Sequence, residues 1–395
     1  MSLMNDVVIV SACRTPIGSF CGALSSLTAP RLGAVVIEES LRRGAISKDA
    51  VDEVILGNVL TAGEGQAPAR QAAIYAGLPP SVECLTINKV CGSGMKAIML
   101  GAQAIQLEDA DVVVAGGMES MSNTPYLLEK VRTGYKMGNA ELVDSMIRDG
   151  LWDAYNNFHM GNAAELCARE CAVPREAQDQ YAILSYRRAQ ESQRQGRFLE
   201  EIIRVGIPQK SGEMLFVEED EDPKKTNFDR IPQLKPAFQK DGTVTAANSS
   251  KINDGAAAVL LMSAEKARAL GLRPLAKIVA SSSAAKKPEW FTTAPADVIP
   301  KVLKKAGLTM DQVDLFEINE AFAVVPLAVN KLLGIDVAKV NVNGGAVAMG
   351  HPIGASGARI VVTLIHALKQ RNLKRGLAAI CIGGGEASGI VLELS

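Results

Sequence analysis

The sequence has few aromatic residues and very few histidines. Phe, Trp and Tyr make up 4% of its 395 residues, and there are three histidines. No apolar run approaches the roughly 18 residues of a membrane-spanning helix, which argues against an integral helical membrane protein. Neither charge dominates, because 42 Lys and Arg face 43 Asp and Glu and leave a net charge of -1. We therefore expect no nucleic-acid partner and no polybasic membrane anchor.

We also expect no targeting segment and no cofactor motif. Residues 1–6 lack the basic and apolar regions of a secretory signal, and no Arg-rich transit segment follows. The seven cysteines are odd in number and scattered, which is typical of reduced thiols in a cytoplasmic protein. Cys167 and Cys171 have no second pair and no matching histidines, so we predict no metal site. The Gly-rich runs fit neither a P-loop nor a dinucleotide fingerprint.

Apolar runs and helical spacings alternate along the first part of the chain. The spacing of apolar residues predicts strands at 6–11, 51–57, 84–88 and 111–117, and helices at 31–43, 67–76 and 95–105. This alternation predicts an α/β fold with a largely parallel sheet.

The C-terminal part repeats this plan. Residues 42–52 align with 304–314 at an offset of 262, and residues 91–96 align with 354–359 at an offset of 263. Because the offset barely drifts, two copies of one α/β unit explain it better than chance. We expect the copies to pack face to face with a site at their junction.

A different segment, 121–251, separates the copies. It lacks the alternation and is too long for a structureless loop, so we predict a small inserted domain that covers the site. Its charged stretch, 213–230, is equally compatible with a solvated excursion.

Cys91 is the first candidate for chemistry. It follows a strand and precedes a Gly-rich start of a helix, where the helix dipole favours a thiolate. This is the geometry of a nucleophile on a sharp turn. The alternative is a small buried residue at the end of a strand.

His351 is the leading candidate for a general base. It lies in a Gly-rich turn just before a helix, which suits an exposed base, whereas His366 lies inside a helical pattern and is expected to be a packing residue. The turn of His351 mirrors the turn of Cys91 in the repeat. We therefore expect the two side chains to meet near a pseudo-twofold axis.

Two further residues end strands of the second copy. Cys381 precedes three glycines, 383–385, whose successive N–H groups are suited to hold an oxyanion. A cysteine in this place is more often structural. Asn319 also ends a strand, where a lone asparagine is usually a cap or turn residue.

Taken together, the motifs resemble the signatures of the thiolase family almost end to end. They lie at residues 88–94, 115–121, 253–258, 319–322, 350–357 and 381–385. The resemblance implies two similar α/β halves with mixed five-stranded sheets, packed as an αβαβα sandwich, plus an inserted loop domain. It divides the chain into an N-terminal half (1–121 and 252–272), a CoA-binding insert (122–251) and a C-terminal half (273–395).

The resemblance also implies a reversible Claisen condensation of two acetyl-CoA molecules to acetoacetyl-CoA and CoA. Cys91 would carry the acetyl group, His351 would accept the proton of Cys91, and Cys381 would deprotonate the second acetyl-CoA. Asn319 and His351 would form one oxyanion hole, and the N–H groups of Cys91 and Gly383 the other.

The same resemblance implies the binding residues and partners. Coenzyme A would contact Leu151, His159, Met160, Phe238, Ala247, Ser250, Ala321 and Phe322. Coenzyme A would be substrate and product, with no tightly bound cofactor, and the protein would form a homodimer or homotetramer.

Two residues depart from the family pattern, since Lys251 and Glu386 stand where uncharged residues are usual. Tyr186 and the segment 245–248 are similar to potassium-activated members, whose site would involve Tyr186, Ala246, Ala247, Ser249 and Val347. Other hypotheses are a degradative 3-ketoacyl-CoA thiolase of broader chain length, a β-ketoacyl synthase, and a non-catalytic acyl-CoA-binding module.

Overall fold

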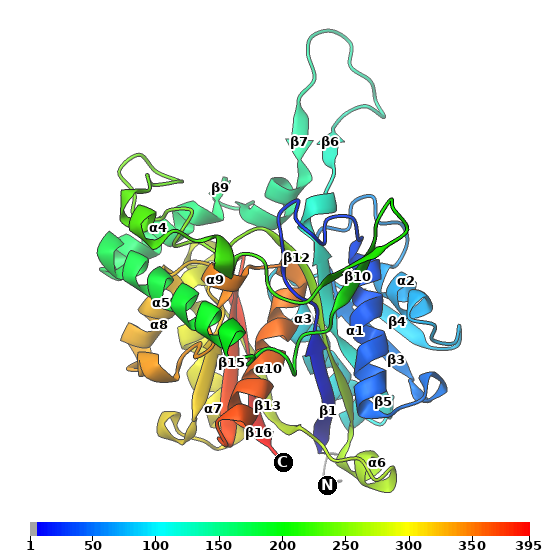
Figure 1. Cartoon of the computed structure of the whole chain (residues 1–395). Coiled ribbons are helices and arrows are strands. Elements are labelled where there is room, and N and C mark those ends of the chain that lie inside the picture. The colour runs from blue at the N-terminus through cyan, green and yellow to red at the C-terminus, as the bar shows by residue number, and fades with distance from the viewer. Residues whose placement is uncertain (1–5) are drawn as a thin grey trace.

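One mixed sheet runs through the molecule (Figure 1). The computed structural model describes residues 6–395. Residues 1–5, which belong to the segment where we expect no secretory signal, lie outside the described part of the chain. The order of the strands is β14 (Leu315–Ile318), β15 (Arg375–Ile382), β16 (Glu386–Leu394), β13 (Ala276–Ala285), β1 (Val7–Arg14), β12 (Asn253–Ser263), β5 (Val112–Ser120), β3 (Glu53–Gly57) and β4 (Glu83–Ile87), with β2 (Gly18–Ser19) paired to β12.

The sheet consists of two repeats joined at their edges. In the first, the order is β4-β3-β5-β12-β1, and in the second β14-β15-β16-β13 follows the same plan. The position of β4 is taken in the second repeat by a single bridge between Phe316 and Val340. The edges meet where β1 pairs with β13 at Val8 and Ile9. Each repeat thus contributes one of the two expected sheets, and the two are continuous through β1 and β13. In the second repeat the edge strand that corresponds to β4 is reduced to one bridge.

The strand directions correct one expectation. Within the described main sheet, three strand pairs are parallel: β3 with β4, β3 with β5, and β14 with β15. The other pairs of named strands in this sheet are antiparallel. The alternation of helices and strands predicted a largely parallel sheet, which is wrong, whereas the mixed sheet implied by the family resemblance is right. Strand β16 follows β15 through a tight turn in which Gly384 and Gly385 have φ of +89° and +86°. A turn this short reverses the chain and makes the pair antiparallel.

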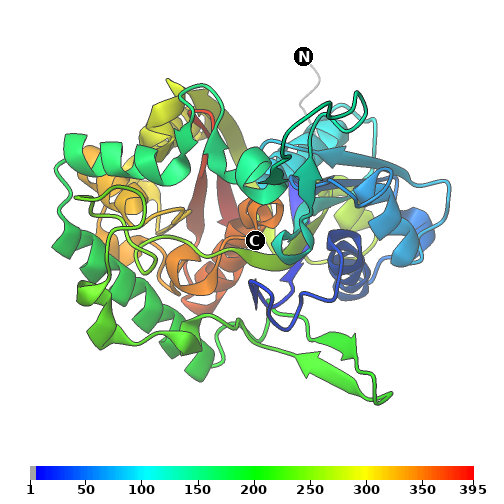
Figure 2. The ribbon, with the colours of Figure 1, turned by 90° about the horizontal axis from the view of Figure 1, so that it is seen from above.

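Helices separate and cover the two repeats. The described helices are α1 (Ala29–Gly44), α2 (Pro68–Tyr75), α3 (Ser93–Gln106), α4 (Met160–Glu170), α5 (Arg175–Arg194), α6 (Ala264–Ala269), α7 (Ala294–Ala306), α8 (Val324–Leu333), α9 (Ala346–Met349) and α10 (Ile353–Gln370). One apolar cluster contains α3, α10 and strands of both repeats, while α1 and α2 cover the first repeat and α7 and α8 the second. Figures 1 and 2 show the resulting αβαβα layers, as the family resemblance implies.

The two central helices approach each other closely. A Cβ on Gly94 of α3 would lie 2.8 Å from the backbone nitrogen of Ala358, and a Cβ on Gly357 of α10 would lie 2.5 Å from that of Met95. The two glycines occupy corresponding positions of the repeat, at the offset of 263. The close contact between α3 and α10 therefore needs glycine on both sides.

The segment between the repeats is built from hairpins and two helices, without the strand–helix alternation. The hairpins pair β6 (Tyr126–Leu128) with β7 (Leu142–Asp144), β8 (Trp152–Asp153) with β9 (Phe158–His159), and β10 (Val205–Pro208) with β11 (Met214–Val217). Hairpin β6–β7 projects from the body, while α4 and α5 pack on α8 and α9 of the second repeat (Figure 1).

Short helical turns complete the chain. They lie at Lys48–Ala50, Met121–Asn123, Met146–Leu151, Pro223–Lys225, Phe228–Gln233, Pro288–Thr293, Met310–Gln312 and Val337–Lys339. Within residues 6–395 no helix combines the length and the apolar character that crossing a membrane requires.

The charged stretch of this segment is not a solvated excursion throughout. Asp220 is buried and binds Arg14 of β1 through two hydrogen bonds of 2.6 and 3.0 Å. Arg14 also binds Glu201 at 2.6 Å, and Glu221 accepts hydrogen bonds from the N–H groups of Ser19 and Ala23. Glu218 and Glu219 are exposed, so the solvated interpretation holds for only part of the stretch.

We expect Asp220→Asn to lower the free energy of unfolding by about 3–5 kcal/mol, because it leaves a buried guanidinium short of a counter-charge. Equilibrium unfolding in urea measures this. The matched control is Glu219→Gln, which removes an exposed pair with Lys224 and should cost less than about 1 kcal/mol. Equal effects of the two substitutions would contradict the buried role of Asp220.

Candidate active site

A cavity of about 270 Å³ opens where the two repeats and the inserted segment meet. Ten of the residues predicted from the sequence line it: Cys91, Leu151, His159, Met160, Phe238, Ser250, Ala321, Phe322, His351 and Gly383. Ala247, Asn319 and Cys381 are buried beside it and are absent from its lining.

Cys91 lies on a sharp turn between β4 and α3, as predicted. The preceding Val90 has φ of +47°, an unfavourable conformation for a β-branched residue. Ser93 holds the turn, because its hydroxyl accepts from the N–H of Lys89 at 2.8 Å and donates to the carbonyl of Val90 at 2.6 Å. The strained turn projects the Cys91 thiol into the cavity.

The protonation of Cys91 differs from the prediction. We expected the helix dipole to favour a thiolate, but burial raises the pKa of Cys91 to about 11. The N–H groups of Gly383 and of Cys91 itself lower the pKa without outweighing burial. Cys91 is therefore a neutral thiol near pH 7, with two backbone N–H groups directed at its sulfur.

The hydrogen bonds of His351 fix its tautomer. Its Nδ1 lies 2.6 Å from the hydroxyl oxygen of Ser356, and that hydroxyl donates its only proton to the carbonyl of Pro352 at 2.8 Å. Nδ1 must therefore carry the ring proton, which leaves a lone pair on Nε2. Nε2 is buried and has no partner within the described residues.

His351 is buried, whereas we expected an exposed base, because the cavity walls close around the turn. Burial, and then the charge of Arg359, lowers the pKa of His351 to about 3. The imidazole is therefore neutral near pH 7 and can accept a proton at Nε2. His366 is a buried residue of α10 whose Nε2 meets the carbonyl of Ala12, in keeping with a packing role.

Cys381 and Asn319 lie side by side behind the cavity. Cys381 is the penultimate residue of β15, and its sulfur is 4.0 Å from the backbone oxygen of Asn319. Burial, and then the neighbouring Cys91, raises the pKa of Cys381 well above its usual value. Both polar atoms of the Asn319 side chain are buried without a partner in the described chain, so they are free to bind a ligand or a bridging water.

Aromatic side chains form one wall of the cavity. His159 stacks on Phe238 with ring centres 4.7 Å apart, and Phe238 meets the edge of Phe322 at 6.0 Å. The N–H of Ser250 donates to the carbonyl of Ala321 at 3.0 Å, which joins the inserted segment to the second repeat. The wall is thus an apolar surface with few polar atoms.

Sequence reasoning missed three residues that hold the turns of Cys91 and His351. Ser356 orients His351, and Asn253 accepts from the N–H of His351 at 3.0 Å. Glu119 joins the two repeats by accepting hydrogen bonds from the N–H groups of Val59, Leu60 and Gly354 and the side chain of Asn58. All three lie inside motifs that carry the family resemblance, Ser356 in 350–357, Asn253 in 253–258 and Glu119 in 115–121, and this is the sequence signal that points to them.

Glu386, one of the two departures from the family pattern, forms an ion pair with Lys89. Lys89 belongs to the turn of Cys91, and Glu386 begins β16. This pair links the turn of Cys91 to the second repeat.

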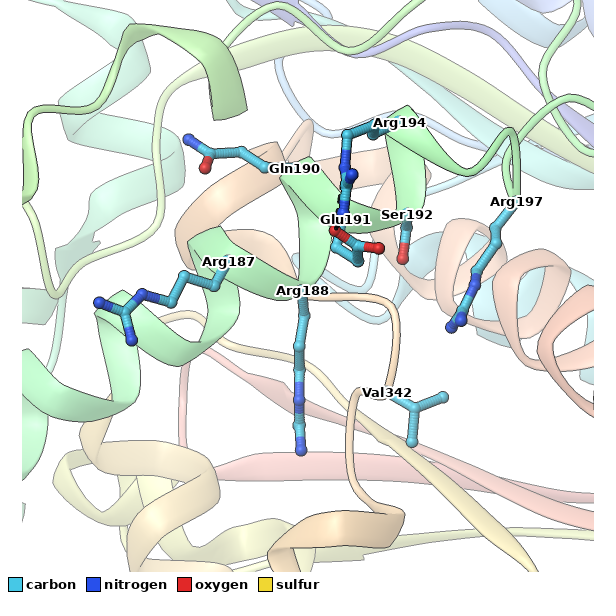
Figure 3. Close-up of a pocket in the computed structure, with 8 residues that line it drawn as sticks. All are labelled: Arg187, Arg188, Gln190, Glu191, Ser192, Arg194, Arg197 and Val342. Carbon is cyan, nitrogen blue, oxygen red and sulfur yellow. Dashed lines mark hydrogen bonds and ion pairs between the residues drawn. The ribbon is translucent and has the colours of Figure 1, made fainter.

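A larger cavity of about 600 Å³ lies on α5 (Figure 3). Four arginines line it together with Gln190, Glu191, Ser192 and Val342: Arg187, Arg188, Arg194 and Arg197. It holds no thiol, imidazole or aspartate, and Arg188 already donates to the carbonyl of Val340 at 2.6 Å. Nor do residues 6–395 contain a cluster of three metal-ligating side chains. The chemistry is therefore expected in the smaller cavity.

The fold defines the class of the protein: a duplicated α/β protein with its cavity at the junction of the repeats. Family models for the N-terminal and C-terminal domains of thiolase match residues 7–265 and 272–394. The chain therefore belongs to the thiolase family.

Full-length relatives and solved structures agree with this assignment. A probable acetyl-CoA acetyltransferase of Dictyostelium discoideum is 56% identical over 390 residues, which cover 99% of this chain and 94% of the relative. An acetyl-CoA acetyltransferase of Pseudomonas aeruginosa is 54% identical, covering 99% of this chain and all of the relative. The crystal structure of the Bacillus anthracis acetyl-CoA acetyltransferase has a TM-score of 0.98 at 42% identity over both whole chains. A thiolase from Ascaris suum in complex with coenzyme A has a TM-score of 0.94 at 48% identity, covering 99% of this chain and 100% of that one.

We expect alkylation of Cys91 by iodoacetamide to accelerate about tenfold per pH unit from about pH 7 to pH 9 and beyond. The reason is that the reactive thiolate fraction grows until the pH reaches the raised pKa of about 11. Mass spectrometry of the peptide containing Cys91 follows the rate. A short blocked peptide with one cysteine serves as the reference, because its thiol has a pKa of about 8.5 and its rate levels off above about pH 9. If the alkylation rate of Cys91 levelled off at the same pH as the reference, or at a lower pH, the raised pKa would be contradicted.

Proposed function

We propose that this chain is an acetyl-CoA C-acetyltransferase that condenses two molecules of acetyl-CoA reversibly to acetoacetyl-CoA and CoA. The observation that carries the proposal is that Cys91, His351 and Gly383 line one cavity while the sulfur of Cys381 lies behind it. The names of the full-length relatives, acetyl-CoA acetyltransferases at 53–56% identity, support the substrate.

In the first half-reaction, the sulfur of Cys91 attacks the carbonyl carbon of acetyl-CoA. Nε2 of His351 accepts the proton of Cys91, since its lone pair is free and its Nδ1 is held by Ser356. The bond between the carbonyl carbon and the CoA sulfur breaks, and Cys381 donates its proton to that sulfur. The products are an acetyl thioester on Cys91 and free CoA, with Cys381 as a thiolate and His351 protonated.

In the second half-reaction, the Cys381 thiolate takes a proton from the methyl carbon of a second acetyl-CoA. The resulting enolate carbon attacks the acetyl group on Cys91, and the carbon–sulfur bond to Cys91 breaks. His351 returns its proton to the departing Cys91 sulfur. Acetoacetyl-CoA leaves and both cysteines regain their thiol forms, so the protons balance over the cycle.

Each half-reaction places negative charge on an oxygen that needs hydrogen-bond donors. The N–H groups of Cys91 and Gly383 are directed at the reacting sulfur and suit the oxygen of the Cys91 acetyl group. The unpartnered side chain of Asn319, acting through a water, and protonated His351 suit the enolate oxygen. A donor of this kind contributes about 3–4 kcal/mol to the transition state.

Coenzyme A would enter along the wall formed by the inserted segment. Leu151, His159, Met160 and Phe238 supply the apolar surface for the pantetheine arm, and Ser250 supplies a polar contact. Ala247 would act only behind this wall, because it is buried outside the lining. Coenzyme A is substrate and product in this scheme, and no resident cofactor takes part.

Mass spectrometry after incubation with acetyl-CoA tests the mechanism. We expect the wild-type protein and Cys381→Ser to gain one acetyl group on Cys91, and Cys91→Ser to gain none. Cys381→Ser should condense at least about 100-fold more slowly, because a serine hydroxyl is a far weaker base at this position. An unacetylated Cys91 in the wild-type protein would refute the scheme.

Chain length separates this function from that of a degradative 3-ketoacyl-CoA thiolase. The cavity of about 270 Å³ is at the small end for ligand sites, and Phe291 and Phe322 narrow it. We therefore expect kcat/KM for thiolysis of acetoacetyl-CoA to exceed that for a ten-carbon 3-ketoacyl-CoA by at least about tenfold. Comparable values for both substrates would favour the degradative function.

The division of the chain, its assembly and its location belong to the same proposal. Residues 1–121 with 252–272 form the N-terminal half, 122–251 the inserted domain and 273–395 the C-terminal half, which the place of β12 between β1 and β5 supports. The protein acts in the cytoplasm as a homodimer or homotetramer. Full-length relatives are named both as cytosolic and as mitochondrial enzymes.

A further inference from the structure

The side chain of Lys251 folds back over the loop that precedes it. Its ammonium nitrogen lies 2.5 Å from the carbonyl oxygen of Ala246 and 3.3 Å from that of Ser249. It also lies 5.6 Å from the centre of the buried Tyr186 ring. Carbonyl oxygens and the face of an aromatic ring both attract a cation. Lys251 forms no ion pair with a carboxylate anywhere in residues 6–395, so these groups are its partners.

The loop that Lys251 holds forms part of the active-site wall. Ser249, Ser250 and Lys251 all line the cavity. The carbonyl of Asn248 accepts from the N–H of Ala323 at 2.8 Å, and Ser249 forms a bridge with Phe322. A shift of the loop would therefore move Ser250 and Phe322 together, at the surface proposed to hold coenzyme A.

These contacts conflict with a potassium ion at the same place. The resemblance to potassium-activated thiolases places such an ion near Tyr186, Ala246, Ala247, Ser249 and Val347. Here the oxygens of Ala246 and Ser249 are already engaged by an ammonium group. Two positive charges about 4 Å apart repel each other by about 4 kcal/mol near a protein surface. The residues of this chain therefore do not fit a potassium ion.

We propose that Lys251 supplies an internal cation that fixes residues 246–251, positions Ser250 for the CoA thioester and makes the enzyme independent of monovalent cations. Lys251 is a positioning residue, since its ammonium acts on the loop and not on the reacting atoms. The inference rests on the proposed thiolase function.

The test compares wild-type protein, Lys251→Met and the control Lys240→Met, which removes an exposed lysine with no hydrogen bond or ion pair within the described chain. Acetoacetyl-CoA thiolysis and thermal unfolding are measured in potassium chloride and in tetramethylammonium chloride at equal ionic strength. The wild-type protein and Lys240→Met should give the same KM, kcat and Tm in both salts.

Lys251→Met should raise the KM for CoA about tenfold in tetramethylammonium chloride, with kcat changed less than about threefold, because the loop loses a charged hydrogen-bond donor. Potassium chloride should lower that KM and raise the Tm of this variant, since the freed carbonyl oxygens can then bind the small cation. Tetramethylammonium is too large to replace it.

Three outcomes overturn the inference: activation of the wild-type enzyme by potassium, an unchanged KM in Lys251→Met, or a raised KM that no small cation reverses. The last outcome would give Lys251 a merely structural role. Should Lys251→Met fail to fold, the wild-type salt comparison and Lys251→Gln decide the question. Absence of thiolysis in the wild-type protein in either salt would instead refute the proposed function, and the Tm comparison would still test the cation.

Discussion

The close contact between α3 and α10 at Gly94 and Gly357 is the constraint on which the rest of the site depends. Each helix begins two residues after a candidate catalytic side chain. Helix α3 begins at Ser93, after Cys91, and α10 begins at Ile353, after His351. At the offset of 263 the two helix starts correspond to within three residues, and since the helices meet near these starts, the two turns open into the same cavity. A side chain at either glycine would push the helices apart and move the thiol away from the imidazole. The duplication thus produces the site by bringing two copies of one turn together.

The sequence allowed the positions of the reactive groups to be predicted better than their surroundings. The turns of Cys91 and His351 are local features, and a repeat at constant offset predicts that they meet. Their protonation was predicted poorly, because it depends on how much of the chain the fold places over them. The charged stretch shows the same limit, since Asp220 is buried against Arg14 while the adjacent Glu219 is exposed. Neighbours in sequence of the same chemical type have opposite environments, and no local pattern distinguishes them.

The two residues that depart from the family pattern have related consequences. Glu386 pairs with Lys89, which is 297 residues away, and links the turn of Cys91 to the second repeat. Lys251 binds the carbonyls of its own loop, which lines the cavity at Ser249 and Ser250. Neither residue is placed among the reacting atoms, so neither alters the order of chemical steps. Both place a charged group where the family pattern has an uncharged residue, one against the turn of Cys91 and one in the loop of Ser250, and loss of freedom in these segments reduces the cost of orienting a thioester.

The neutral resting state of the site follows from its burial and fits the chemistry of thioesters. Burial keeps Cys91 and Cys381 as thiols and His351 as a free imidazole. A permanent thiolate–imidazolium pair would carry charge in an apolar cavity before any substrate had arrived, and desolvation opposes that state. In the proposed reaction, charge instead develops when a thioester carbonyl enters, because its oxygen then takes up the negative charge beside the N–H groups of Cys91 and Gly383. Those N–H groups are fixed by the strained turn at Val90 and by the glycine turn after β15, so they need no reorganisation during the reaction. The same burial that makes the isolated thiol a poor nucleophile therefore strengthens the interactions that stabilise the transition state.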